Sequence, residues 1–204
     1  MKILAPLYNQ WEQVPAVIRT FLLWGLFLLV FWKLAYVLYW APKGTLDIPL
    51  TTLVGTHTAG TLNALNHSEQ YSAVLTQSQS RTDPNQLGPQ VNAKVFYGDK
   101  PILTIANACN GLELLVLYAG FIFSYPARWQ RKALFLLFGI PLVHAINIAR
   151  CVGLGYLSVW RPHYFDFAHH YLFKIMIYSS ILLLWWAFTS FSTSSPRHES
   201  SALA

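Results

Sequence analysis

The sequence contains four apolar runs that are each long enough to cross a lipid bilayer as a helix. The hydrocarbon core of a membrane is about 30 Å thick and a helix rises about 1.5 Å per residue, so about 20 apolar residues are needed. Only 11% of the 204 residues are charged, against about 25% in soluble domains. We therefore predict an all-α polytopic membrane protein, a single integral membrane domain over residues 1–204 with about four transmembrane helices. These helices are expected at residues 21–40, 108–125, 133–157 and 169–191.

The basic residues indicate how the helices are oriented. Residues 126–132, a short loop between the second and third runs, contain three of them, and short cytoplasmic loops are enriched in Lys and Arg. With this loop inside, both termini are cytoplasmic, including a polar tail at residues 192–204 that is predicted to be disordered. Residues 41–101 and 158–168 then lie outside. The first run is too long for a signal peptide and no Ala-x-Ala site follows it, so we predict a multi-pass protein of the cytoplasmic (inner) membrane.

The formal net charge of +6 is compatible with nucleic acid or with lipid as a partner. The basic residues lie at the ends of apolar runs and form no stripe with interleaved aromatic residues. We therefore interpret the charge as a topology signal and a contact with anionic lipid. The sequence predicts the lipid bilayer as a partner, and no nucleic acid.

Residues 41–101 are predicted to form a small extracytoplasmic insertion. A helix is expected to start at residues 47–49 and to lie on the membrane surface through an apolar stripe. Alternating apolar residues at 91–97, a Gly-Asp turn and a second apolar run at 102–105 predict a β-hairpin. Because its second strand leads directly to Cys109, we expect the insertion to form a lid over that residue. The expected stripe comprises Leu50, Leu53, Val54, Leu62 and Leu65.

The most reactive candidate is Cys109, in the sequence Asn-Ala-Cys-Asn-Gly at the mouth of the second run. The other cysteine is Cys151, and the absence of Cys-x-x-Cys argues against a disulfide framework and a thiolate zinc site. Depth in the membrane can be counted from the cytoplasmic end of each helix at about 1.5 Å per residue. This count puts Cys109 roughly 24 Å, Arg150 roughly 26 Å and His169 roughly 33 Å above the cytoplasmic boundary. One thiol, one guanidinium and one imidazole thus come from three helices to a similar depth, which favours a reactive site.

Each of these residues also has an ordinary structural interpretation. Arg150 could reach the outer interface or pair with an acidic side chain, Cys109 could be a small buried hydrophobe, and His169 could be a helix cap. Against this, Asn147 and Arg150 are spaced to share one helix face. A charged residue in a membrane span is costly unless it faces protein or water. Taken together, the three residues favour a site over three separate structural roles.

Three short motifs resemble the signatures of the exosortase/archaeosortase family. They are Asn-Ala-Cys-Asn-Gly-Leu at residues 107–112, Asn-Ile-Ala-Arg at residues 147–150, and a histidine that opens the last helix. The resemblance covers residues 105–186, and we expect the catalytic core at residues 105–190. Members of this family are polytopic membrane cysteine transpeptidases. They cut C-terminal sorting signals, which combine a short motif, a transmembrane helix and a basic tail, from exported proteins.

The resemblance implies a role for each matching residue. Cys109 corresponds to the nucleophile, Arg150 to the essential arginine and His169 to the third member, with His170 as the alternative. His169 is favoured because Asp166 gives it the Asp-x-x-His spacing of several members. The implied partners are exported proteins that carry such a sorting signal. The chain is shorter than the larger exosortases, which have more spans on the N-terminal side.

The residue types support the same chemistry without the family. A thiol attacks as the thiolate, which a helix N-terminus and nearby cations stabilise. We expect Cys109 to attack a peptide carbonyl, Arg150 to stabilise the oxyanion or the thiolate, and His169 or His170 to protonate the leaving amine. An amine or water would then resolve the thioacyl-enzyme, and no cofactor or metal is expected. Supporting roles are predicted for Asn107, Asn110 and Asn147.

Three other functions remain compatible with the sequence. His and Asp residues between 163 and 170 offer ligands for a metal-dependent membrane enzyme, although this leaves Cys109 and Arg150 unexplained. Pairing of Cys109 with Cys151 would suit a membrane thiol oxidoreductase, although Cys-x-x-Cys is missing. A non-catalytic membrane assembly factor would tolerate the loss of Cys109.

Overall fold

The computed structural model describes residues 13–67, 69–78 and 90–190. The chain is a polytopic membrane protein, as predicted, but the expected second span is short. That helix, α4 (Leu112–Ser124), has 13 residues and rises only about 20 Å. The predicted tail at residues 192–204 lies outside the described residues. Within the described ranges, three helical stretches are long and apolar enough to cross a membrane, namely Ile18–Lys43, Trp129–Trp160 and Pro162–Ser190.

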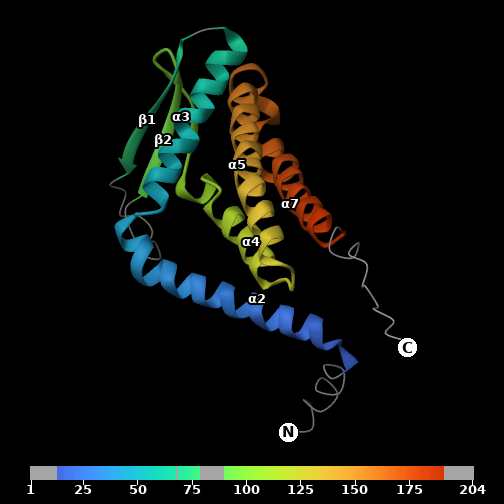
Figure 1. The fold of residues 1–204 in the computed structure, drawn as a ribbon. Coiled ribbons are helices and arrows are strands. Elements are labelled where there is room, and N and C mark those ends of the chain that lie inside the picture. Colours follow the sequence, from blue (N-terminus) through green and yellow to red (C-terminus); the bar gives the residue numbers. More distant parts are fainter. Residues whose placement is uncertain (1–12, 68, 79–89, 191–204) are drawn as a thin grey trace, which may run out of the picture.

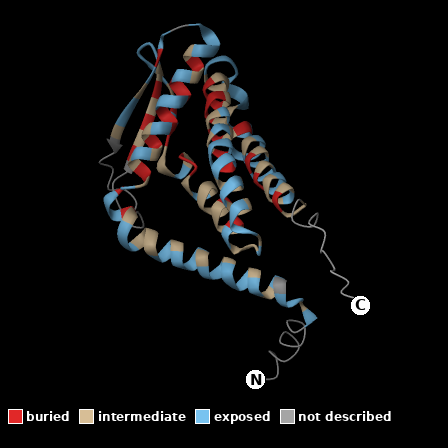
Figure 2. Cartoon of the chain, in the orientation of Figure 1, coloured by how far each residue is buried: buried red, intermediate tan, exposed pale blue. Residues whose placement is uncertain are grey.

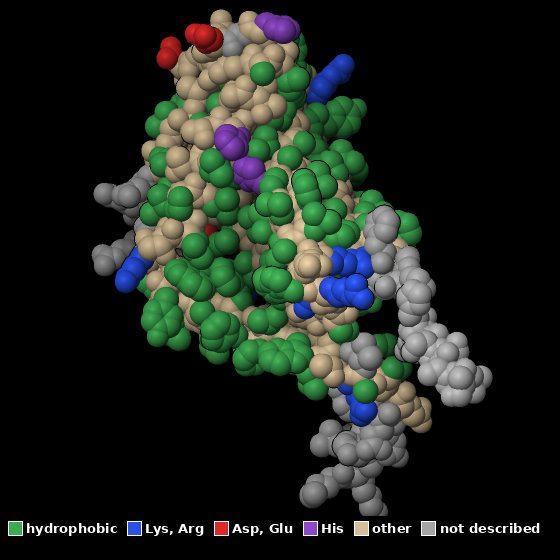
Figure 3. Space-filling model, viewed as in Figure 1, with side chains coloured by type: hydrophobic (Ala, Val, Ile, Leu, Met, Phe, Trp, Pro, Cys, Tyr) green, Lys and Arg blue, Asp and Glu red, His purple; other side chains and the backbone are tan. Residues whose placement is uncertain are grey.

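The first helix, α2 (Ala16–Ala35), continues through a π-helical turn (Tyr36–Trp40) and a 3-10 turn (Ala41–Lys43). It runs beside α4 (Figure 1), from Phe21 against Phe121 to Lys33 against Glu113, and most of its surface is exposed (Figure 2). That surface is largely hydrophobic (Figure 3), as expected for a helix that faces lipid. Phe21 anchors α2 to the bundle, because its ring packs edge-on against Phe121 of α4 with centroids 5.2 Å apart.

The bundle consists of α4, α5 (Trp129–Trp160) and α7 (Phe173–Ser190). The chain enters α7 through a 3-10 turn (Pro162–Tyr164), one turn of α6 (Phe165–Phe167) and a π-helical turn, η5 (Ala168–Leu172). The helices pack around a buried apolar cluster. Its members are Tyr118, Ile122, Val143 and Phe188.

The insertion consists of α3 (Asp47–Asn66) and a three-stranded antiparallel sheet. Its strands are β1 (Tyr71–Ser78), β2 (Gln90–Tyr97) and β3 (Lys100–Ile105), in the order β1-β2-β3. The predicted hairpin is confirmed as β2 and β3, and the predicted helix does begin at Asp47. In Figure 1, α3 lies between the sheet and one half of α5.

The apolar face of α3 packs against protein and not against the membrane surface. Val54 and Leu62 are buried in one cluster with the strands and with α5. Gly55 lies so close to the sheet that a Cβ there would be 2.7 Å from the Cβ of Ala93. The expected membrane-facing stripe is therefore wrong for Val54 and Leu62, because strand side chains cover them, whereas Leu53 is exposed. The insertion and the bundle are joined through this packing.

Candidate active site

Cys109 lies on the turn where the chain passes from the sheet into the bundle. Asn107–Cys109 form a 3-10 turn in which the Cys109 N–H donates to the carbonyl of Ala106 at 2.8 Å. Gly111 then takes a left-handed φ of 86°, a conformation that favours glycine. A Cβ at Gly111 would lie 3.0 Å from Nδ2 of Asn147. Glycine at this position therefore lets α5 approach the turn closely.

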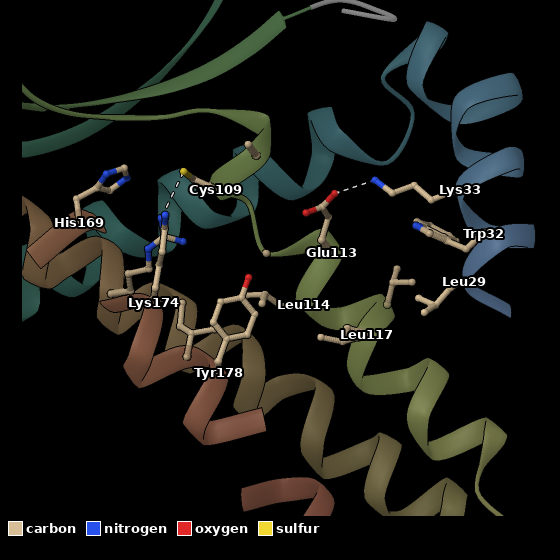
Figure 4. Close-up of a pocket in the computed structure, with 15 residues that line it drawn as sticks. Leu29, Trp32, Lys33, Cys109, Glu113, Leu114, Leu117, His169, Lys174 and Tyr178 are labelled. Carbon is tan, nitrogen blue, oxygen red and sulfur yellow. Dashed lines mark hydrogen bonds and ion pairs between the residues drawn. The ribbon is translucent and has the colours of Figure 1, made fainter. Parts of the chain in front are cut away.

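Two residues of α5 hold this turn. Asn147 is buried, and its Nδ2 donates to the carbonyl oxygen of Cys109 at 3.2 Å. One helical turn further on, Nη2 of Arg150 lies 3.4 Å from the sulfur of Cys109 (Figure 4). Nε of Arg150 is buried and has no hydrogen-bond partner within the described part of the chain. The guanidinium is thus placed to stabilise a thiolate on Cys109.

His169 lies on the π-helical turn η5, at the start of the last helix. Its ring stacks on that of Phe165, with centroids 6.0 Å apart and 7° between the planes, and Figure 4 shows the imidazole directed toward the thiol. No hydrogen bond joins His169 to Cys109 in the described part of the chain. His170 is exposed, and its ring meets that of His169 in a T-shaped contact with centroids 5.0 Å apart.

Cys109, Arg150 and His169 line two cavities at once. The larger, about 580 Å³, is lined by α2, α4 and α7, mainly with apolar side chains but also with Lys33, Glu113 and Lys174. The smaller, about 450 Å³, lies on the β3 side, between that strand and α5. His170 lines neither of these two cavities. The three reactive groups therefore lie where the two cavities meet.

A buried polar network fixes the other side of the turn. Nδ2 of Asn110 donates to Oδ1 of Asp47 at 3.0 Å, and the hydroxyl of Tyr36 donates to Oδ2 at 2.7 Å. Thr51 contacts both amide side chains, since it accepts from Asn110 at 3.3 Å and donates to Asn107 at 3.2 Å. Asp47 and Thr51 are buried, and no motif or spacing in the sequence had pointed to them as part of the site.

The alternatives open at the sequence level find little support in these contacts. Glu113 pairs with Lys33 at 3.1 Å and not with Arg150. The described residues contain no group of three or more His, Cys, Asp or Glu side chains that could hold a metal ion. Both thiols are free, and Cys151 is buried in the apolar cluster between α3, the sheet and α5.

Comparison with models of protein families matches residues 5–187 to the family described as transmembrane exosortase. The chain belongs to the transmembrane exosortase family. The match confirms the resemblance drawn from the three motifs. It also extends far beyond them, because it includes α2, α3 and the sheet. No curated protein and no solved structure matches this exosortase.

Membership in the transmembrane exosortase family supports a general role as a membrane transpeptidase or protease that acts on exported proteins. The polar centre of this exosortase fits that role, because a thiol, a guanidinium and an imidazole line a common space.

Proposed function

We propose that this exosortase cleaves the C-terminal sorting signal of exported proteins with Cys109 as the nucleophile. The reaction is placed at the extracytoplasmic face of the cytoplasmic membrane. The observation that carries the proposal is the contact of 3.4 Å between Nη2 of Arg150 and the sulfur of Cys109, at the point where two cavities meet. A cation beside a partly exposed thiol is the arrangement of a reactive cysteine.

The proposed reaction has two steps. The thiolate of Cys109 attacks the carbonyl carbon of the substrate, and Arg150 stabilises the oxyanion that forms. The C–N bond then breaks, and the leaving amine takes a proton from His169, which leaves a thioacyl-enzyme. An incoming amine or water attacks that thioester while the imidazole accepts its proton. The C–S bond breaks, and the thiolate is restored.

His169 is preferred to His170 as the proton donor. His169 lines both cavities beside the thiol, whereas His170 is exposed and lines neither. Asn147 and Asn110 are proposed to hold the catalytic turn, through the carbonyl of Cys109 and through Asp47. Asn107 supports the same turn through its contact with Thr51.

The two parts of the chain have separate proposed tasks. Residues 105–190 supply all three reactive groups and form the catalytic core. Residues 41–101 cover the core as a lid, because α3 and the strands pack over the half of α5 that carries Arg150. The mainly apolar lining of the larger cavity suits a substrate whose sorting signal is itself a membrane helix.

The test compares Cys109→Ala with wild type in the native host. Exported proteins that end in an apolar helix and a basic tail are followed by mass spectrometry of their C-termini. The tail should be removed by wild type and retained with Cys109→Ala. Cys151→Ala is the control for the loss of a thiol. It shortens one side chain in the wall of the smaller cavity but removes none of the three proposed reactive groups, so its variant should still remove the tail. Identical C-termini in the wild-type and Cys109→Ala hosts would contradict the proposal.

A further inference from the structure

The strand that leads to Cys109 has a free edge. Among the strands of the described residues, β3 is at one edge of the sheet and pairs with β2 alone. In the described part of the chain, residues 100–105 form no backbone hydrogen bond outside that pairing. An unpaired edge presents a row of N–H and C=O groups to any extended chain that reaches it. Pro101, which lacks an N–H, is typical of such an edge strand.

The smaller cavity runs along this edge. Pro101, Ile102, Leu103, Thr104 and Ile105 all line it. Successive side chains of a strand point to opposite faces, so a cavity over one face would be lined by every second residue. Ile102 is the extra residue of a bulge opposite Val95 and Phe96 and breaks the alternation locally. Leu103, Thr104 and Ile105 follow the bulge and still line the cavity one after another, which is what an edge produces. The facing wall consists of Cys151 and Leu154 of α5, together with Phe165 and His169.

The cavity is continuous with the reactive groups. Cys109 and Arg150 also line it, and only Ala106, Asn107 and Ala108 separate β3 from Cys109 in the chain. An extended peptide lying along β3 therefore reaches the sulfur just beyond the end of the strand. Past the sulfur lies the larger cavity with its mainly apolar lining from α2, α4 and α7.

We propose that the substrate segment preceding the cleaved bond binds as an additional strand, parallel to β3. This inference rests on the proposed function. The direction follows from the two cavities. β3 runs toward Cys109, and the residues that follow the bond, where the substrate's own apolar helix begins, then meet the apolar side chains of the larger cavity. Main-chain hydrogen bonds to β3 supply the binding, and alternate side chains meet the largely apolar wall around Leu154 and Phe165.

Disulfide trapping tests both the pairing and its direction. The probe is the exported protein whose processing stops in the Cys109→Ala host, with single cysteines placed along the segment around the cleaved bond. The enzyme carries Cys109→Ala and Cys151→Ala, plus either Thr104→Cys or Pro101→Cys; both positions are exposed and line the cavity. Neighbouring strands lie about 4.8 Å apart, which is within the Cα separation that a disulfide accepts.

Both enzyme cysteines should trap substrate positions upstream of the bond, and the favoured position for Pro101→Cys should lie about three residues further upstream than that for Thr104→Cys. The matched control is Val74→Cys on β1, which is exposed at the opposite edge of the sheet and should trap nothing. A shift in the opposite direction would show an antiparallel strand and overturn the proposal. Equal trapping by the β1 cysteine would also overturn it.

A proline scan of the substrate separates this inference from the proposed function. Proline removes one N–H, so wild-type enzyme should cleave about tenfold more slowly when it occupies every second position upstream of the bond. Cleavage that is equally fast at all positions overturns strand addition, while the proposed function stands because the tail is still removed. If no exported protein is processed in a Cys109-dependent way, both proposals fall.

Discussion

Nη2 of Arg150 lies 3.4 Å from the sulfur of Cys109, although 41 positions separate the two residues in the chain. The contact joins α5 to the turn before α4, and it depends on two neighbours. Gly111 allows α5 to approach, and Asn147 holds the carbonyl of Cys109. The distance between the Arg150 guanidinium and the sulfur thus depends on the conformation of the whole turn at residues 107–111.

Arg150→Gln removes the positive charge next to the thiol. We expect alkylation of Cys109 by iodoacetamide to become about tenfold slower, and substrate processing to fall by about 100-fold or more because the oxyanion loses its partner. The measurement uses a Cys151→Ala background, so that one thiol reacts. Arg161→Gln, at the exposed end of α5, is the control and should behave as wild type. Unchanged alkylation in Arg150→Gln would show that the guanidinium does not act on the sulfur.

Replacing each of the two histidines with alanine in turn identifies the proton donor. His169→Ala should lower processing by about 100-fold, in the range of general acid catalysis, because this ring lines both cavities. His170→Ala should retain processing within about threefold, since its side chain is exposed. Alkylation of Cys109 serves as a check that the turn is intact in both variants. A larger loss in His170→Ala than in His169→Ala would reverse the assignment.

Gly111→Ala should strain the catalytic turn. A residue with a side chain is unfavourable by about 1–2 kcal/mol in the left-handed region, and the new Cβ would also press on Nδ2 of Asn147. We expect a lower unfolding temperature in detergent and a loss of processing. Gly60→Ala is the matched control, because nothing lies within 4 Å of its Cβ position on α3 and alanine favours a helix. Equal stability of the two variants would argue against the strain.

Asp47→Ala should loosen the turn from the opposite side. It removes the carboxylate that accepts from the amide of Asn110 and from the hydroxyl of Tyr36, and a lost buried partner costs about 1–3 kcal/mol. The free energy of unfolding should fall by that amount, and processing should fall with it. A double-mutant cycle with Tyr36→Phe should give a coupling of about 1 kcal/mol. Glu69→Ala, an exposed carboxylate, should change neither quantity, and zero coupling in the cycle would contradict the role of Asp47.

Local patterns in the sequence predicted the elements that depend on local interactions. The alternation at residues 91–97 and the Gly-Asp turn predicted β2 and β3, because side-chain alternation and turn geometry are encoded within a few residues. The start of α3 at Asp47 and the apolar helices were predictable for the same reason. The number of residues from the cytoplasmic end of each helix also indicated that Cys109, Arg150 and His169 lie at a similar depth in the membrane. All three line the same two cavities.

The features that could not be predicted from the sequence depend on contacts between segments that are distant in the chain. Asp47 and Asn110 are 63 positions apart, and no spacing rule connects them. A long polar stretch separates β1 from β2 in the sequence, and the pairing of these two strands was not predicted. The apolar face of α3 was read as membrane-facing because periodicity identifies a buried face without identifying what buries it. His169 was favoured over His170 only by the family resemblance, and the cavities add the physical distinction.

The short length of α4 bears on which acceptor completes the reaction. This helix begins just after the catalytic turn and rises about two thirds of the thickness of the hydrocarbon core. A thioester on the turn next to α4 would form beside the apolar side chains of the larger cavity, which faces the membrane-spanning helices α2 and α7. We therefore expect an amine-bearing acceptor that diffuses within the membrane to compete well against hydrolysis. The ratio of new amide to free acid at the product C-terminus measures that partition, and a predominance of free acid with acceptor present would contradict the expectation.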